Sequence, residues 1–147
     1  MKILKNLTFI CFALVGILGY GFAMVYLFRP EYMPYHAIAV DIPWEELTPG
    51  IQVLILALMR VAGGGWLATS VSITFFLVAR KKYKSPFFSY ALVLVGISAL
   101  VPTLIATLFV KFNSPANPPW IAAVLGIAIL IVGLILDFIV RGKENRK

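Results

Sequence analysis

The sequence holds one cysteine, Cys11, and one histidine, His36, among its 147 residues. A single cysteine excludes a disulfide within the chain and CxxC redox chemistry. A single histidine excludes bis-histidine haem ligation by this chain alone. No two histidine, cysteine or carboxylate side chains have metal-ligand spacing on one expected helix, so we expect no metal and no cofactor. GxSxG and phosphate-loop patterns are also missing, and the sequence therefore offers no standard signature of an enzyme.

Charged residues are scarce as well. Only 13% of the residues are charged and 61% are hydrophobic, with a mean hydropathy of +0.96, whereas soluble domains are about a quarter charged. One small globule cannot hide this much apolar surface, so we expect lipid to be the solvent for much of it. The net charge of +7 does not indicate nucleic-acid binding, because the basic residues are grouped at the ends of apolar runs, as membrane topology requires.

Four apolar runs are long enough to cross a bilayer as helices, which takes about 20 residues. They predict transmembrane helices over residues 6–28, 51–79, 86–110 and 120–140. Thr48-Pro49 and Ser85-Pro86 have the residue types of an N-cap and first helical position. We therefore expect an all-α integral membrane protein with a single domain over residues 1–147. The four helices should form an antiparallel bundle, with an ordered outer loop over residues 29–50 and a cytoplasmic tail over residues 141–147.

The basic residues also predict the orientation. One side of a four-pass protein would hold most of them: Lys2, Lys5, Arg80, Lys81, Lys82, Lys84, Arg141, Lys143, Arg146 and Lys147. The other side would hold two basic and four acidic residues: Arg29, Lys111, Glu31, Asp41, Glu45 and Glu46. The positive-inside rule then places both termini in the cytoplasm. Although the first run has some features of a signal peptide, we expect it to be a retained helix.

A single arginine, Arg60, interrupts the second apolar run. That run would be about 43 Å long as a straight helix, against a hydrocarbon core of about 30 Å. Counting about 20 residues back from the basic cluster at Arg80 leads to Arg60, so we expect its guanidinium near the outer edge of the hydrocarbon. Residues 51–59 would then project beyond the membrane beneath the outer loop, unless the helix is strongly tilted.

A partly buried arginine favours a carboxylate or an anionic ligand as its partner. The outer loop offers His36 and three carboxylates, Asp41, Glu45 and Glu46. One hypothesis is a polar pocket at the outer face, built from Arg60, His36 and one of these carboxylates. Two simpler interpretations remain open: Arg60 reaches the lipid headgroups, or it fixes the loop without binding any ligand.

Two further features have structural interpretations. The glycines Gly63, Gly64 and Gly65 would allow a neighbouring helix, or less readily a ligand, to approach the backbone closely, and we expect helix packing. Asp137 could be a proton-relay carboxylate in the fourth run. However, it stands four residues before Arg141 near the inner boundary, and an i,i+4 ion pair is the better explanation.

The motifs MPYH, PWEEL, RVAGGGW and PPW occur in this order between Met33 and Trp120. In these motifs the chain resembles a group of small, uncharacterised four-pass bacterial membrane proteins. The arginine followed by glycines is more loosely similar to the DoxX-like four-helix membrane proteins. The resemblance implies a bacterial inner-membrane location, and it brings no catalytic residues.

The leading functional hypothesis is a non-enzymatic membrane protein. It would bind a lipid or another amphipathic anion at the outer pocket, or act as an accessory subunit of a membrane complex. One alternative is a small homo-oligomeric transporter, which would need an ionisable group deep in the bundle. Another is a membrane enzyme acting on a lipid-linked substrate through His36 and a loop carboxylate. Membrane lipid and a membrane protein partner or second copy are therefore the expected partners.

Overall fold

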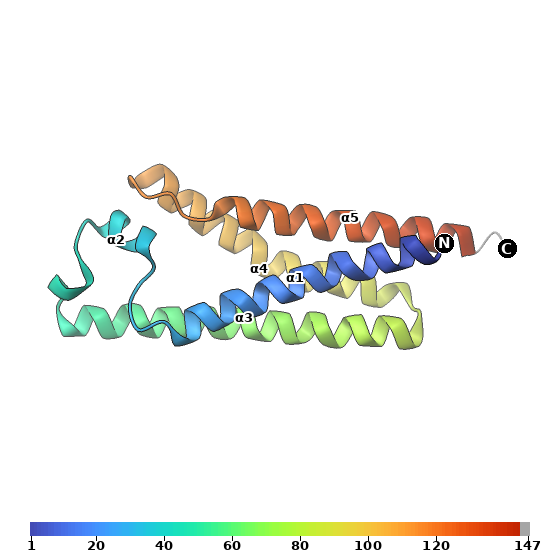
Figure 1. Cartoon of the computed structure of the whole chain (residues 1–147), viewed down its shortest axis with the longest axis horizontal. Coiled ribbons are helices and arrows are strands. Elements are labelled where there is room, and N and C mark those ends of the chain that lie inside the picture. Colours follow the sequence, from blue (N-terminus) through green and yellow to red (C-terminus); the bar gives the residue numbers. More distant parts are fainter. Residues whose placement is uncertain (145–147) are drawn as a thin grey trace.

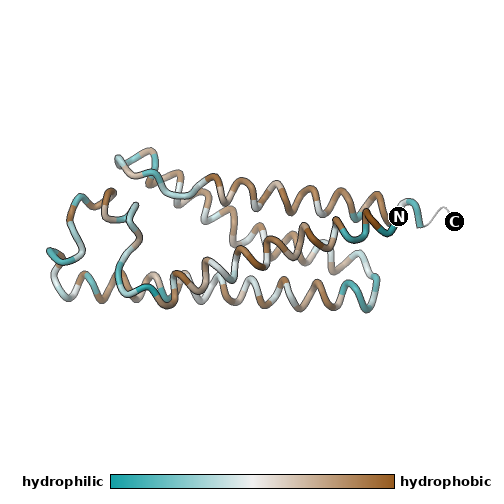
Figure 2. Tube along the Cα trace, in the orientation of Figure 1, coloured by the Kyte–Doolittle hydropathy of each residue, from teal (hydrophilic) through white to brown (hydrophobic). Residues whose placement is uncertain are grey.

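The computed structural model describes residues 1–144, and these residues form helices without any strand. The elements follow one another as α1 (Lys2–Phe28), α2 (Pro34–Val40), the short 3₁₀ helix η1 (Trp44–Glu46), α3 (Pro49–Tyr83), α4 (Pro86–Asn113) and α5 (Trp120–Glu144). Four of them, α1, α3, α4 and α5, are long and apolar enough to cross a membrane, which is the pattern of a multi-pass membrane protein. Figure 2 shows apolar residues along all four, with polar residues mostly at their ends and in the connections.

The four long helices lie side by side (Figure 1), and each of them packs against two others. Helix α1 contacts α3 and α5, and α4 contacts the same two helices. The beginning of α1 and the end of α5 lie together at one end of the molecule, which we call the terminal end. Helix α2 and η1 lie at the opposite end, which we call the loop end. The central core consists of residues from all four long helices, such as Phe12, Ile73, Leu92 and Leu130.

The predicted helix starts are confirmed at two places. Thr48 is the N-cap of α3 with Pro49 in its first turn. Ser85 is the N-cap of α4, and its hydroxyl accepts a hydrogen bond from the amide N–H of Phe87 at 3.3 Å. A proline in the first helical turn removes only an N–H that would lack a helical partner anyway. Both helices therefore begin where local sequence favours it.

Of the remaining boundaries, the end of α1 at Phe28 and the start of α5 at Trp120 lie where they were predicted, whereas four helix ends extend beyond the predicted residues. Helix α1 already begins at Lys2, α3 continues to Tyr83, α4 to Asn113 and α5 to Glu144. The apolar run marks only the lipid-compatible part of a helix, while flanking lysine and arginine residues are good helix formers and prolong it. Of the predicted tail, residues 141–144 are thus helical. Arg146 and Lys147, which entered the orientation argument, lie outside the described residues.

The predicted outer loop contains two short helices, α2 and η1, and it packs on the loop end of α3. Tyr32 and Leu47 of this segment are buried together with Met59 of α3. The Tyr32 hydroxyl donates to the carbonyl of Ile42, and its ring lies edge-on to Trp44 at a centroid distance of 5.0 Å. The loop covers only one face of α3, because Val53, Leu54, Leu58 and Val61 remain exposed.

Candidate functional site

Arg60 lies where α1 ends. Its guanidinium donates hydrogen bonds to the carbonyl of Tyr26 at 2.8 Å and to that of Arg29 at 2.9 Å. The last carbonyls of a helix have no partner within the helix, and they carry the negative end of its dipole. Arg60 therefore caps α1 from the neighbouring helix α3.

The residues proposed for an outer pocket make no direct polar contact with Arg60. Within residues 1–144, no hydrogen bond or ion pair joins Arg60 to His36, Asp41, Glu45 or Glu46. Asp41 instead ends α2 in the left-handed conformation, and the two glutamates belong to η1. Two backbone carbonyls satisfy the guanidinium, and sequence alone does not reveal this because it requires the end of another helix to lie beside Arg60.

His36 occupies a partly buried position in the loop. Its Nδ1 accepts a long hydrogen bond, 3.4 Å, from the amide N–H of Met33, and its ring contacts that of Tyr35 edge-on. Burial lowers the pKa of His36 below its usual value. No carboxylate in the described part of the chain pairs with this imidazole.

Among the three adjacent glycines, Gly63 alone touches another helix. A β-carbon placed on Gly63 would lie 2.9 Å from the amide nitrogen of Leu27 in α1 and 3.1 Å from the carbonyl carbon of Tyr26. A β-carbon on Gly64 or Gly65 would meet no atom within 4 Å. Of the three glycines, only Gly63 therefore supports the predicted close packing, which is between α3 and α1.

A buried ionic cluster lies at the terminal end. Asp137 of α5 is 3% exposed, and its two carboxylate oxygens accept from different arginines. Oδ2 accepts from Arg141 Nε at 2.7 Å, as the i,i+4 spacing predicted, while Oδ1 accepts from Arg80 of α3. The contribution of Arg80 was missed, because only the packing of α3 near α5 brings them together.

The two arginines also extend the cluster to backbone and hydroxyl groups. Arg80 Nε donates to the buried hydroxyl of Ser89 in α4 at 3.0 Å. Arg141 donates to the carbonyls of Lys84 at 2.7 Å and Ser85 at 3.2 Å, just after α3 ends. The cluster thus joins α3, α4 and α5, and every oxygen of the buried carboxylate has a charged donor.

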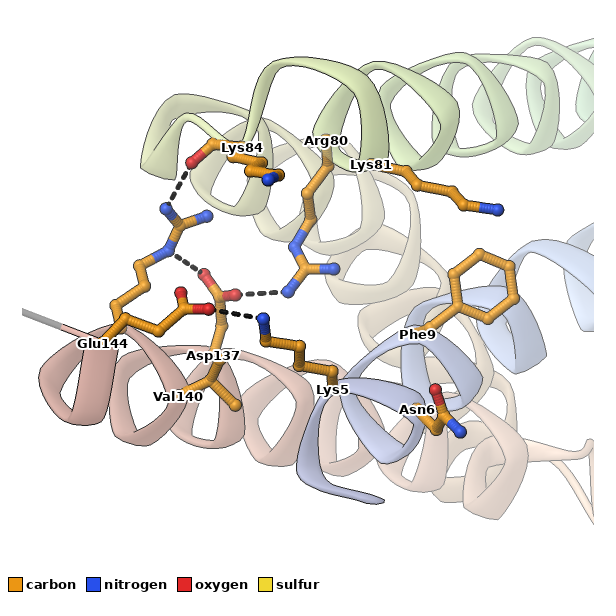
Figure 3. A pocket seen from close by; sticks show the side chains of 10 residues that line it. Lys5, Asn6, Phe9, Arg80, Lys81, Lys84, Asp137, Val140 and Glu144 are labelled. Atoms are coloured by element: carbon orange, nitrogen blue, oxygen red, sulfur yellow. Dashed lines mark hydrogen bonds and ion pairs between the residues drawn. The ribbon is translucent and has the colours of Figure 1, made fainter. Parts of the chain in front are cut away.

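Beside this cluster lies a cleft of about 400 Å³ between α1, α3 and α5 (Figure 3). We call it the terminal cleft. Its lining consists of Lys5, Asn6, Phe9, Arg80, Lys81, Lys84, Asp137, Val140, Arg141 and Glu144. The Phe9 ring and the Val140 side chain are its apolar part, and the remaining residues are polar or charged. Figure 3 shows the charged groups of Lys5, Arg80, Asp137 and Glu144 close to one another on one side of the cleft.

The terminal cleft has an excess of positive charge. Its lining includes five cationic and two anionic side chains, which leaves three positive charges unbalanced. Both carboxylates are already engaged: Asp137 by the two arginines, and Glu144 by an ion pair with Lys5. Within residues 1–144, the ammonium groups of Lys81 and Lys84 form no ion pair. The cleft can therefore attract an anion by its overall charge and hold it through free ammonium donors.

The described residues contain no group of three or more histidine, cysteine, aspartate or glutamate side chains that could hold a metal ion. The side chains that line the terminal cleft can supply charge attraction, hydrogen-bond donation and apolar contact.

No family model, curated protein or solved structure matches the chain, so the similarity to DoxX-like proteins stays a prediction and the function is inferred from the geometry of the chain itself.

Proposed function

We propose that this protein is a non-enzymatic, four-pass protein of the bacterial inner membrane that binds an anionic lipid or a similar amphipathic anion in the terminal cleft. The supporting observation is the unbalanced positive charge of a cleft that also has apolar walls. Basic pockets between transmembrane helices on the cytoplasmic side are suited to anionic lipid headgroups.

The length of α3 supports placing the terminal cleft at the level of the lipid headgroups. From Arg60 to Arg80 an α-helix rises about 30 Å, which equals the thickness of the hydrocarbon core. With these two arginines at opposite boundaries, the terminal cleft lies at the level of the headgroups. The basic residues near both ends of the chain then orient this face toward the cytoplasm under the positive-inside rule, with neighbouring helices antiparallel.

A fusion protein tests this orientation. A reporter enzyme that is active only outside the cytoplasm, fused after the last residue, should be inactive, because the C-terminus lies in the cytoplasm. An active reporter would show that the orientation is the opposite one.

An amphiphile fits the cleft better than a small soluble anion. Lys81 and Lys84 would hold the negatively charged headgroup, while Phe9 and Val140 provide apolar contacts next to it. These two residues belong to α1 and α5, whose apolar surfaces continue toward the loop end. An acyl chain attached to the headgroup could follow those surfaces into the bilayer.

The geometry gives less support to the rival functions. A proton-coupled transporter needs an available ionisable group deep in the membrane, whereas two arginines bind the Asp137 carboxylate near one end of the bundle. An enzyme using His36 would need a carboxylate or nucleophile in reach. No carboxylate in the described residues pairs with the imidazole, which contacts the Tyr35 ring edge-on, and the Tyr35 hydroxyl is hydrogen-bonded to Tyr26 instead.

The direct test removes the two unpaired lysines of the cleft. We expect the double variant Lys81→Gln/Lys84→Gln to bind dioleoyl phosphatidic acid about ten- to thirtyfold more weakly than the wild type, because each lysine near an anionic headgroup contributes about 1 kcal/mol. Native mass spectrometry of the protein in mild detergent, titrated with this lipid, measures the change.

The matched control is Lys82→Gln/Lys111→Gln, which removes the same charge from positions outside the cleft. Lys111 lies over the Trp120 ring, and Lys82 contacts Tyr83. The control should bind nearly as well as the wild type. Equal weakening of both double variants would mean that binding follows net charge alone, and the proposed site would be wrong.

A further inference from the structure

The ion pair between Lys5 and Glu144 joins the first turn of α1 to the last turn of α5, and both residues line the terminal cleft. This ion pair is much more exposed to solvent than the ionic cluster around Asp137. The Lys5 side chain is 50% exposed and that of Glu144 is 44% exposed, whereas the Asp137 side chain is 5% exposed. Both pairs nevertheless border the same cavity (Figure 3).

These exposures decide which ion pair a ligand can exchange. Removing Asp137 from its arginines would leave a buried charge without a partner, at high cost. An exposed lysine–carboxylate pair, in contrast, is worth little, because water solvates both groups when they separate. An incoming anion can therefore take Lys5 from Glu144 but cannot take Arg80 or Arg141 from Asp137.

On the basis of the proposed lipid binding, we propose that Glu144 is an internal competitor for Lys5, which a phosphomonoester headgroup displaces when it enters the terminal cleft. Displacement frees a third ammonium group next to those of Lys81 and Lys84. The released carboxylate turns to water at the end of α5. No covalent bond forms or breaks in this exchange.

The charge of the cleft favours a phosphomonoester over a phosphodiester. A phosphomonoester carries between one and a half and two negative charges at pH 7, whereas a phosphodiester carries one. The cleft has three positive charges in excess while Glu144 is counted as part of it. A headgroup of higher charge gains more from this potential, and it gains still more once the Glu144 carboxylate has moved away.

The test compares two lipids with the same acyl chains, dioleoyl phosphatidic acid and dioleoyl phosphatidylglycerol, in native mass spectrometry. The wild type should retain phosphatidic acid more strongly. Replacing Glu144 by glutamine should raise the affinity for phosphatidic acid about two- to fivefold, the range expected when an exposed competing ion pair is removed. The gain for phosphatidylglycerol should be smaller.

Two further variants separate competition from a general effect of charge. Glu31→Gln removes a carboxylate that is also 44% exposed and paired with an arginine, but at the loop end, and it should leave lipid binding unchanged. Lys5→Gln removes the contested cation. In that background Glu144→Gln should raise affinity by a clearly smaller factor than it does with Lys5 present.

The outcomes separate this inference from the function on which it rests. If Glu144→Gln leaves affinity unchanged or lowers it while Lys81→Gln/Lys84→Gln still weakens binding, the competitor role is wrong and the lipid site stands. If Glu144→Gln raises affinity equally with and without Lys5, the carboxylate acts by repulsion alone and the displacement is wrong. If no cleft variant changes binding, the proposed function itself fails.

Discussion

At the scale of single residues, Arg60 and Gly63 together hold the end of α1. Arg60 donates to two carbonyls at that end, and Gly63 lets the backbone of α1 approach α3 one turn further along. A β-carbon at position 63 would lie 2.8 Å from Leu27 Cγ, and it would also meet backbone atoms of Leu27 at 2.9 Å and Tyr26 at 3.1 Å. Because backbone cannot move aside as a flexible side chain can, this contact tolerates no added atom without separating the helices.

This contact makes opposite predictions for two adjacent glycines. Gly63→Ala should destabilise the protein by about 1–3 kcal/mol, the usual cost of overpacking. Gly64→Ala should be neutral or stabilising by up to about 1 kcal/mol, since alanine is the better helix former and a β-carbon there would meet no atom within 4 Å. Thermal unfolding in detergent measures both. Equal melting temperatures for the two variants would contradict the packing described for Gly63.

At the scale of elements, α2 depends on side-chain contacts rather than on a buried face. It has seven residues, none of them buried, and an isolated helix of that length is not stable in water. The Tyr35 hydroxyl hydrogen-bonds to that of Tyr26 in α1 at 2.6 Å, and the ring of His36 packs on Tyr35. The stability of the loop end therefore depends on the charge state of this histidine.

The lowered pKa of His36 gives the sign of a pH effect. Because burial disfavours the imidazolium in the folded loop, the unfolded loop binds the proton more readily, and protonation favours unfolding. The contribution of neutral His36 to the stability of the folded loop is fully present above the unfolded pKa of about 6.5, and it is lost as the pH falls below that value. Hydrogen-exchange protection factors of residues 34–40 should thus decrease between pH 7.5 and pH 5.

The control for this prediction is His36→Gln, which cannot titrate in that range. Its protection factors should stay constant over the same interval, after correction for the intrinsic exchange rate. A loss of protection in the variant as large as that in the wild type would assign the pH effect to another group.

At the scale of the whole molecule, the sequence predicted what depends on local patterns. Apolar run length identified the four long helices, Thr48 and Ser85 marked two helix starts, and the i,i+4 spacing identified the pair Asp137–Arg141. Each of these features involves residues close together in the chain, and each follows from helix geometry alone.

What the sequence did not predict depends on how the helices pack. Arg60 has partners 31 and 34 residues away, and Arg80 meets a carboxylate 57 residues away. The i,i+4 rule cannot reveal such pairs. The terminal cleft combines side chains from three helices and was therefore not among the expected sites, although the basic residues at both ends of the chain were the signal that could have indicated it.

The most direct test of the central claim is a structure of the protein in lipid nanodiscs that contain phosphatidic acid. We expect density for a phosphate group in the terminal cleft, within hydrogen-bond distance of Lys81 or Lys84, with an acyl chain leaving past Phe9. A structure in which the cleft holds no lipid, while ordered phosphatidic acid lies at the loop end beside Arg60, would contradict it.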